Sequence, residues 1–337
     1  MRDRAGAWRL CRTARATRAD RPFCQFEDRS RYSSFPNHVP AGWSATLSQP
    51  GKLGVFYFCD ALASAELPAV AQRIEKLGYG TLWIPEAVGR EAMSSASWLL
   101  SATTRLNIAT GIANIYARDP MTMAAAAKTL AEQSGGRFIC GIGVSHKPMV
   151  EGLRGHAYDK PLSFMRQYLD AMAAALYVAP PPAEQPPVVI GALHPKMLAL
   201  AAEKTAGAHP YLMPPEHTAF AREILGPDAL LCPEQKVLLE TDPTRARAAA
   251  RQALAMYLEL PNYQRALKRF GMEDVDFADG GSDRLIDTCV AWGDEQAIAA
   301  RVRAHHDAGA DHVCVQTIDP SGSVQPDWRA LEAVAAA

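Results

Sequence analysis

The sequence has no apolar run close to the roughly 20 residues that a membrane-spanning helix needs, so nothing in it predicts a membrane partner. It also has no excess of positive charge. Its 35 Lys and Arg residues are matched by 36 Asp and Glu, which gives no reason to expect a nucleic-acid partner. With 337 residues, 48% of them hydrophobic, the chain is long enough to bury a large core within one domain.

Paired cysteine motifs are missing as well. The chain has seven Cys, an odd number, and no two of them have the Cys-x-x-Cys spacing. Cys59, Cys140 and Cys314 lie in or beside apolar segments that are typical of strands. We therefore predict buried free thiols and a cytoplasmic protein, because a reducing compartment keeps such thiols unpaired.

A metal site is equally hard to find. The run His305-His306-Asp307 is the obvious candidate, but it lies at the end of a predicted helix. Adjacent residues of a helix point about 100° apart, so the two imidazoles cannot share one face. We predict a solvated helix end there and no metal.

The first fifty residues differ from the rest. Residues 1–50 hold nine Arg, no Lys and only four acidic residues, so they are basic while the remainder is acidic. Pro22, Pro36 and Pro40 interrupt any helix. We predict a disordered basic N-terminal extension over residues 1–50; an organelle transit peptide is the alternative.

From Gly51 onward, short apolar segments alternate with amphipathic stretches of helical length. Such alternation predicts parallel strands joined by helices, and eight strands favour a (β/α)8 TIM barrel over residues 51–337. An open doubly wound sheet would also suit six to eight such units. The predicted strands are Leu53–Phe58, Thr81–Pro85, Leu106–Ile112, Phe138–Gly143, Val188–Gly191, Ala208–Leu212, Glu234–Glu240 and His312–Thr317.

One segment interrupts this alternation. Residues 261–289 contain an acidic patch and the run Gly280-Gly281-Ser282-Asp283, with no strand-like apolar segment. We interpret this segment as an inserted helical lid before the last unit of the barrel. In a barrel, functional loops follow the carboxyl ends of the strands, and these loops are where site residues are expected.

Three of these loops carry distinctive patterns. After the third strand comes Thr110-Gly111-Ile112-Ala113-Asn114, followed by Arg118-Asp119-Pro120 at the start of a helix. The fourth strand and its loop read Gly-Arg-Phe-x-x-Gly-x-Gly over 136–143 and end at His146. The fifth ends in Gly191 and is followed by a Pro195 that begins a helix, whose free N–H groups favour an anion.

These patterns, in this order, resemble the luciferase-like monooxygenase superfamily. The runs 143–146 (GVSH), 150–161 (VEGLRGHAYDKP), 260–263 (LPNY) and 278–285 (ADGGSDRL) are similar to one branch of it, the mycobacterial-type F420-dependent oxidoreductases. The resemblance covers about residues 51–320. It implies a deazaflavin or flavin ring held at the barrel mouth, against a non-proline cis peptide bond at Gly111–Ile112.

The resemblance also implies roles for individual residues. It makes His146 an acid or base near the ring, as a neutral imidazole can be near pH 7. It makes Glu86, at the end of the second strand, a further polar group that faces the ring or the substrate. The implied cofactor-binding residues are Gly111, Ile112, Asn114, Gly143, Val144, Ser145, Ala192, Leu193, His194 and Lys196.

The function that follows is hydride transfer between coenzyme F420 and a small substrate. The aromatic residues Trp98, Tyr116 and Tyr263 hint at a mostly apolar organic molecule. Two alternatives stay open on the same fold: a monooxygenase that uses reduced FMN and O2, and a barrel that binds a flavin or deazaflavin without catalysis. Relatives are commonly dimers, so we expect a homodimer.

Overall fold

The computed structural model of the chain describes residues 50–337. The predicted N-terminal extension, and with it Cys11 and Cys24, therefore lies outside the described residues, apart from Pro50.

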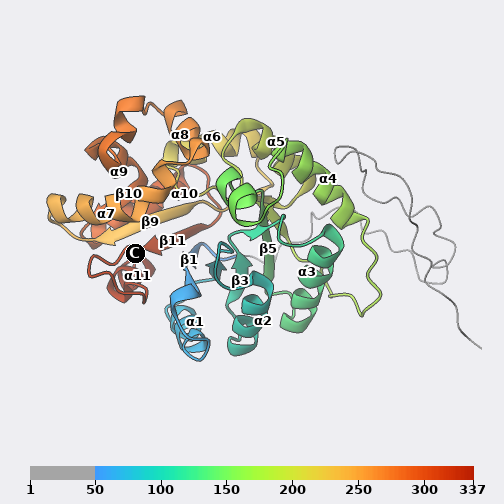
Figure 1. Cartoon of the computed structure of the whole chain (residues 1–337). Helices are drawn as coiled ribbons and strands as arrows, with labels where there is room; N and C mark the ends of the chain where they lie inside the picture. The colour runs from blue at the N-terminus through green and yellow to red at the C-terminus, as the bar shows by residue number, and fades with distance from the viewer. Residues whose placement is uncertain (1–49) are drawn as a thin grey trace, which may run out of the picture. The chain divides into compact units, whose positions relative to one another are not determined.

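The described residues form a ring of parallel strands surrounded by helices (Figure 1). Each strand is mostly buried, because its inner face packs in the ring and its outer face packs on a helix. The strands of the ring are β1 (Leu53–Phe56), β2 (Thr81–Ile84), β3 (Asn107–Thr110), β5 (Phe138–Gly143), β6 (Val188–Ile190), β7 (Gly207–Ala208), β8 (Leu230–Leu231), β9 (Glu234–Leu239) and β11 (Val313–Thr317).

The ring closes through one continuous run of chain, residues 230–239. β8 and β9 are the two halves of this run, separated only by Cys232 and Pro233. On one side Cys232 N donates to Ala208 O (2.9 Å); on the other, Cys314 N donates to Pro233 O (3.0 Å). Since β8 pairs with β7 and β9 pairs with β11, the eight-stranded barrel is confirmed over the open sheet.

Two strands differ from the prediction. The sixth was expected over 208–212, but β7 ends at Ala208 and Leu212 has a left-handed backbone (φ 63°). Leu212 N donates to the Glu234 side chain (2.9 Å) instead of to a neighbouring strand. An additional strand, β10 (Val290–Gly293), was not predicted; it pairs with residues 236–239, the carboxyl-terminal part of β9. The short strand β4 (Ala113–Asn114) pairs with β5.

The helices begin and end at the residue types expected of them. Asp119 caps α3 by accepting a hydrogen bond from Thr122 N (3.0 Å), with Pro120 in the first helical position and Gly135 in a left-handed conformation (φ 64°) at the end. The helices are α1 (Leu67–Lys76), α2 (Ala92–Ala102), α3 (Pro120–Ser134), α4 (Pro161–Ala173), α5 (Pro195–Lys204), α6 (Pro215–Leu225), α7 (Pro243–Leu258), α10 (Glu295–Asp307) and α11 (Trp328–Ala335).

The segment 261–289 is helical, as expected. It contains α8 (Pro261–Arg269), a 3-10 segment η4 (Asp274–Gly280) and α9 (Asp283–Cys289), which lie beside α7 and β10 (Figure 1). Their apolar residues form a second cluster that includes Leu193, Leu212 and Met213 from the ends of the barrel strands. The inserted segment is therefore packed onto the carboxyl-end face of the barrel.

The barrel interior is mainly aromatic and apolar. Phe56, Trp83, Ile139 and Val189 fill it together with Cys232 and Cys314. Five cysteines of residues 50–337 are buried free thiols, which confirms that prediction for Cys59, Cys140 and Cys314.

The prediction for His305 was wrong. Its side chain is fully buried, not solvated, and lies between Thr218 Oγ1 (2.8 Å) and Gln235 Oε1 (3.0 Å). α10 packs this histidine inward against α6 and β9, a contact between segments far apart in the sequence. No group of three or more metal-ligating side chains occurs in residues 50–337.

Candidate functional site

The loop after β3 lies at the carboxyl end of the barrel and carries the predicted cis bond. Gly111–Ile112 is a non-proline cis peptide in the structure, which confirms the expectation. A Cβ atom at Gly111 would lie 3.1 Å from Phe56 and from His209, and 3.3 Å from Trp83. The absence of a side chain at Gly111 therefore lets the loop sit directly on the aromatic interior of the barrel.

The two glycines of β5 are explained by neighbouring residues of the same loop. A Cβ at Gly141 would lie 1.8 Å from Thr110 O, and one at Gly143 would lie 2.7 Å from the end of the Ile112 side chain. A Cβ at Gly191 would also reach Ile112, at an ordinary 3.6 Å. The pattern Gly-x-Gly thus makes room for the β3 loop, and Gly143 and Gly191 both border Ile112.

Asn114 is held so that its amide nitrogen is free. Its backbone N–H donates to Glu86 (2.7 Å), and its side-chain Oδ1 accepts from Tyr116 N (2.9 Å). Because Oδ1 is the acceptor, Nδ2 points the other way, and no acceptor for it occurs among residues 50–337. The Asn114 amide can therefore donate to a ligand.

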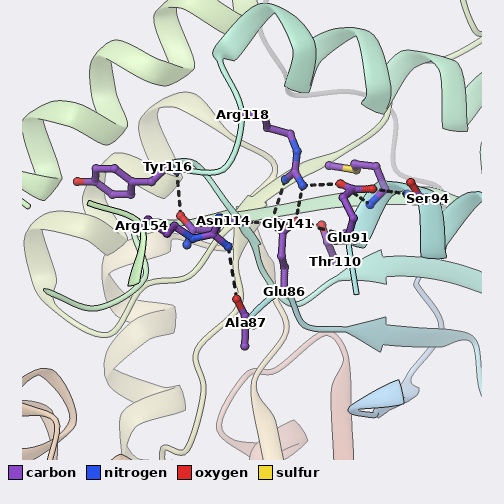
Figure 2. A network of polar contacts seen from close by, with 12 residues as sticks. Glu86, Ala87, Glu91, Ser94, Thr110, Asn114, Tyr116, Arg118, Gly141 and Arg154 are labelled. Atoms are coloured by element: carbon purple, nitrogen blue, oxygen red, sulfur yellow. Dashed lines mark hydrogen bonds and ion pairs between the residues drawn. The ribbon is translucent and has the colours of Figure 1, made fainter. Parts of the chain in front are cut away.

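Glu86 has a different environment from the one expected. Its carboxylate forms an ion pair with Arg118, and both side chains are nearly buried (5% and 9% exposed). Figure 2 shows Arg118 reaching from the end of the β3 loop to Glu86 and Glu91. With Asn114 N also bound to it, the Glu86 carboxylate is occupied by the protein. We therefore assign Glu86 to holding the β3 loop in place.

His146 follows β5 and is half-buried. Its ring lies 5.4 Å from that of Tyr263, which comes from α8. Burial lowers the pKa of His146 below its ordinary value of 6.5, so the imidazole is neutral at pH 7. Within residues 50–337 its ring nitrogens have no hydrogen-bond partner, and they remain available to exchange a proton.

The residues just before and after His146 shape its loop. Ser145 has a left-handed backbone (φ 55°), and its carbonyl accepts a hydrogen bond from the Tyr158 hydroxyl (3.2 Å). His146 O accepts from the N–H groups of Met149 and Val150 at the start of a π-helical turn, η3 (Pro148–Leu153). Val144 is half-buried and packs on the main core. The backbone of this loop is thus fixed on both sides of His146.

The turn between β6 and α5 provides unused N–H groups. The backbone N–H groups of Ala192, Leu193 and His194 have no acceptor in residues 50–337, and they precede the positive end of the α5 dipole. Lys196 is exposed at the first turn of the same helix. This turn can bind an anionic group such as a phosphate.

The His194 side chain is bound within the protein. Its Nε2 lies 3.0 Å from Asn262 Oδ1, which links the turn to α8. Burial lowers the pKa of His194; the nearby Arg265 charge acts in the same direction, and the contact with Asn262 opposes both. Its imidazole therefore ties α8 to the turn, so that any contribution of His194 to anion binding rests on its backbone N–H.

Sequence reasoning missed a residue beneath this turn. His217 is fully buried in α6, and its Nε2–H donates to Leu193 O (2.9 Å). The contact holds the Leu193 carbonyl inward and leaves the N–H groups facing outward. The sequence separation of 24 residues gives no local signal of this pairing.

Comparison with known proteins shows the family of this chain. The family model of luciferase-like monooxygenases matches residues 45–312. The chain belongs to the luciferase-like monooxygenase family. A relative named a putative coenzyme F420-dependent oxidoreductase, from Mycobacterium tuberculosis, is 30% identical over 236 residues, which are 58% of this chain and 67% of the relative.

Solved structures share the fold. The F420-dependent tetrahydromethanopterin reductase of Methanopyrus kandleri superposes with a TM-score of 0.68 at 18% identity, covering 84% of this chain and 97% of that one. The oxygenating constituent of 3,6-diketocamphane monooxygenase from Pseudomonas putida, solved with FMN, gives 0.62 at 14% identity, with 84% and 96% covered. No helix within residues 50–337 is long and apolar enough to cross a membrane.

Proposed function

We propose that this member of the family is an oxidoreductase that transfers a hydride between coenzyme F420 and a small, mostly apolar organic substrate. The observation that carries the proposal is the set of unused donors at the ends of β3, β5 and β6. These are the Asn114 amide, the His146 imidazole and the N–H groups of residues 192–194. The F420-dependent relatives support it.

The residues fit such a cofactor by their chemistry. F420 has a ring with polar edges and an anionic phosphodiester tail. Asn114 offers an amide to the ring, and the N–H groups before α5 offer an anion site to the tail. When bound, F420 supplies the hydride acceptor or donor. The protein binds and orients it, and His146 takes or gives the proton at the substrate.

A reduced-FMN monooxygenase is the second candidate, because the FMN-bound neighbour shares the fold and FMN carries a phosphate suited to the same N–H groups. Titration of the purified protein with F420 and with FMN, followed by fluorescence, separates the two. We expect F420 to bind and O2 uptake with reduced FMN to be absent. Preference for FMN together with O2 uptake would overturn the proposal; F420 binding without turnover of any acceptor would indicate a non-catalytic barrel.

A matched variant tests the Asn114 amide. Asn114→Asp keeps the oxygen that accepts from Tyr116 N and replaces the NH2 donor by a carboxylate oxygen of nearly the same shape. We expect its affinity for F420 to fall. Its thermal stability should fall as well, because Asn114 is buried and the new charge lies beside the Glu86 carboxylate. Unchanged affinity would exclude Asn114 from the cofactor site.

A further inference from the structure

A buried polar cluster is formed by β9, β11, α7 and the segment that follows β7, elements that supply none of the donors described above. We call it the Lys236 cluster; it consists of Lys236, Glu234, Tyr211, Gln316 and Tyr257. Glu234 and Lys236 are two residues apart on β9, so both point into the barrel. Both are fully buried, whereas Tyr211, Tyr257 and Gln316 are half-buried.

Lys236 is the centre of the cluster. Its Nζ lies 2.7 Å from the Tyr211 hydroxyl, 2.9 Å from Gln316 Oε1 and 3.1 Å from Glu234 Oε1. Three acceptors match the three N–H groups of an ammonium ion. The other oxygen of Glu234 accepts from Leu212 N (2.9 Å), so the ion pair is internally satisfied.

The donors that remain unused can be identified by following the hydrogens. An ammonium ion only donates, so Gln316 must turn Oε1 toward Lys236 and Nε2 away from it. No acceptor for Nε2 occurs in residues 50–337. Tyr211 has one hydroxyl hydrogen for two acceptors, Gln316 Oε1 (2.8 Å) and the Tyr257 hydroxyl (2.9 Å). When Tyr211 donates to Tyr257, the hydrogen of Tyr257 is also without an acceptor there.

The Lys236 cluster borders the candidate site through one aromatic ring. Tyr263 of α8 lies 5.4 Å from His146, 5.7 Å from Tyr257 and 6.3 Å from Tyr211, measured between ring centroids. Only the Tyr263 ring therefore lies between His146 and Tyr257, so a molecule beside His146 would lie near the unused donors of Tyr257 and Gln316. The donors expected to bind the cofactor lie on the other strands, β3, β5 and β6.

Stability alone does not account for such a cluster. Replacing a buried ion pair by well-packed apolar residues is often neutral or stabilising, because removing two charges from water is costly. Burial disfavours both charges here, lowering the pKa of Lys236 and raising that of Glu234, while their mutual contact opposes both changes. Perturbed groups of this kind at the mouth of a barrel are characteristic of functional sites.

We propose that the Lys236 cluster binds the oxygen atom of the substrate, through the Tyr257 hydroxyl and the Gln316 Nε2–H, and that the substrates are ketones or aldehydes and the corresponding alcohols. The inference rests on the proposed function. In such a reduction the carbonyl carbon receives a hydride from the reduced cofactor, and the oxygen receives a proton from His146, which is then re-protonated from solvent. The ketone becomes an alcohol and the cofactor is oxidised. The two donors face the oxygen on which negative charge develops, and the ammonium behind them stabilises that charge.

The test compares three variants of the full-length protein. Tyr257→Phe removes one unused donor and leaves the contacts of Lys236 in place. Gln316→Glu removes the other: it keeps the oxygen that accepts from Lys236 Nζ and replaces the NH2 donor by a carboxylate oxygen. Tyr177→Phe is the matched control: it removes a hydroxyl from another half-buried tyrosine, one that contacts Thr129 Oγ1 (3.2 Å). F420 affinity and melting temperature are measured first. Re-oxidation of reduced F420 is then followed with a panel of aliphatic and aryl ketones and aldehydes, and with cyclic imines as acceptors that lack the oxygen.

We expect carbonyl compounds to be reduced, and kcat/KM to fall roughly 100-fold in Tyr257→Phe and in Gln316→Glu, as for removal of one oxyanion donor. F420 affinity should not change, and Tyr177→Phe should behave as wild type. If F420 binds and is re-oxidised, but both site variants match Tyr177→Phe or only imines are reduced, this inference is overturned and the proposed function stands. If the wild type binds no F420, both are overturned.

Discussion

At the scale of single residues, His146 and Glu86 show how polar partners within the protein separate two candidate catalytic groups. Both follow a barrel strand, and the resemblance to the family implied that both face the ring or the substrate. In the structure the Glu86 carboxylate is occupied by Arg118 and Asn114 N, whereas the His146 ring nitrogens have no partner among the described residues. We therefore propose His146, rather than Glu86, as the group that exchanges a proton with the substrate.

The pH dependence of activity tests this assignment. In the direction of substrate oxidation by F420, the neutral imidazole takes a proton. Because burial lowers the pKa of His146 below 6.5, kcat/KM should stay level through pH 7 and fall only below pH 6.5. His146→Asn should lose about 100-fold in kcat/KM and lose this acidic decline. Glu86→Gln is the control that should keep it. An acidic decline that persists in His146→Asn would assign the base elsewhere.

At the scale of elements, the positions of the β3 and β5 loops were predicted correctly. The side chain that packs against their glycines was not predicted. The resemblance implied that Gly143 binds the cofactor. In the structure the side chain of Ile112 lies in the space where a Cβ of residue 143 would be. The contact joins residues 31 apart, and it depends on the exact path of the β3 loop. Residue type and order predicted the position, but not the neighbour.

Substitution of Gly143 follows from this packing. A Cβ there would lie 2.7 Å from Ile112, so Gly143→Ala must displace that side chain. We expect a loss of roughly 1–3 kcal/mol in the free energy of unfolding, as for other overpacked sites. F420 affinity should fall with it, because Ile112 borders the expected ring site. Denaturant unfolding and F420 titration measure the two effects.

Gly152→Ala is the control for this substitution, since a Cβ at Gly152 would meet nothing within 4 Å. It should lie within about 0.5 kcal/mol of wild type. Equal stability of the two variants would mean that Ile112 has room to move.

Other elements show which parts of the structure a local sequence pattern can predict and which it cannot. The first five strands were found because each is an apolar segment bounded by turn residues. β10 was missed because Val290 follows α9 directly, with no turn residue between helix and strand. The Lys236 cluster was missed for a different reason. Tyr211 and Gln316 are 105 residues apart in the sequence, and only closure of the barrel brings them together.

At the scale of the whole molecule, four buried histidines connect distant parts of the barrel in their neutral form. Burial lowers the pKa of each, to about 4 for three of them and about 3 for the fourth. Their partners lie on other elements. His209 Nδ1, for example, lies 2.7 Å from Cys232 O, and His312 Nε2 accepts from Trp83 Nε1 (2.9 Å). The four are His209, His217, His312 and His305, in the order of these pKa values.

Stability should therefore decline in mild acid. An unfolded chain protonates these histidines near pH 6.5 and the folded chain does not, so the unfolded state binds more protons below that pH. Each of the four histidines should lower the free energy of unfolding by about 1 kcal/mol per pH unit, between pH 6.5 and its pKa in the folded protein. In His305→Gln the loss of unfolding free energy between pH 7.5 and pH 5 should be smaller than in wild type by roughly 1–2 kcal/mol. His306→Gln, the same change at the half-buried neighbour on α10, is the control. Identical pH dependence in wild type and His305→Gln, measured by denaturant unfolding, would show that His305 gains its proton without unfolding.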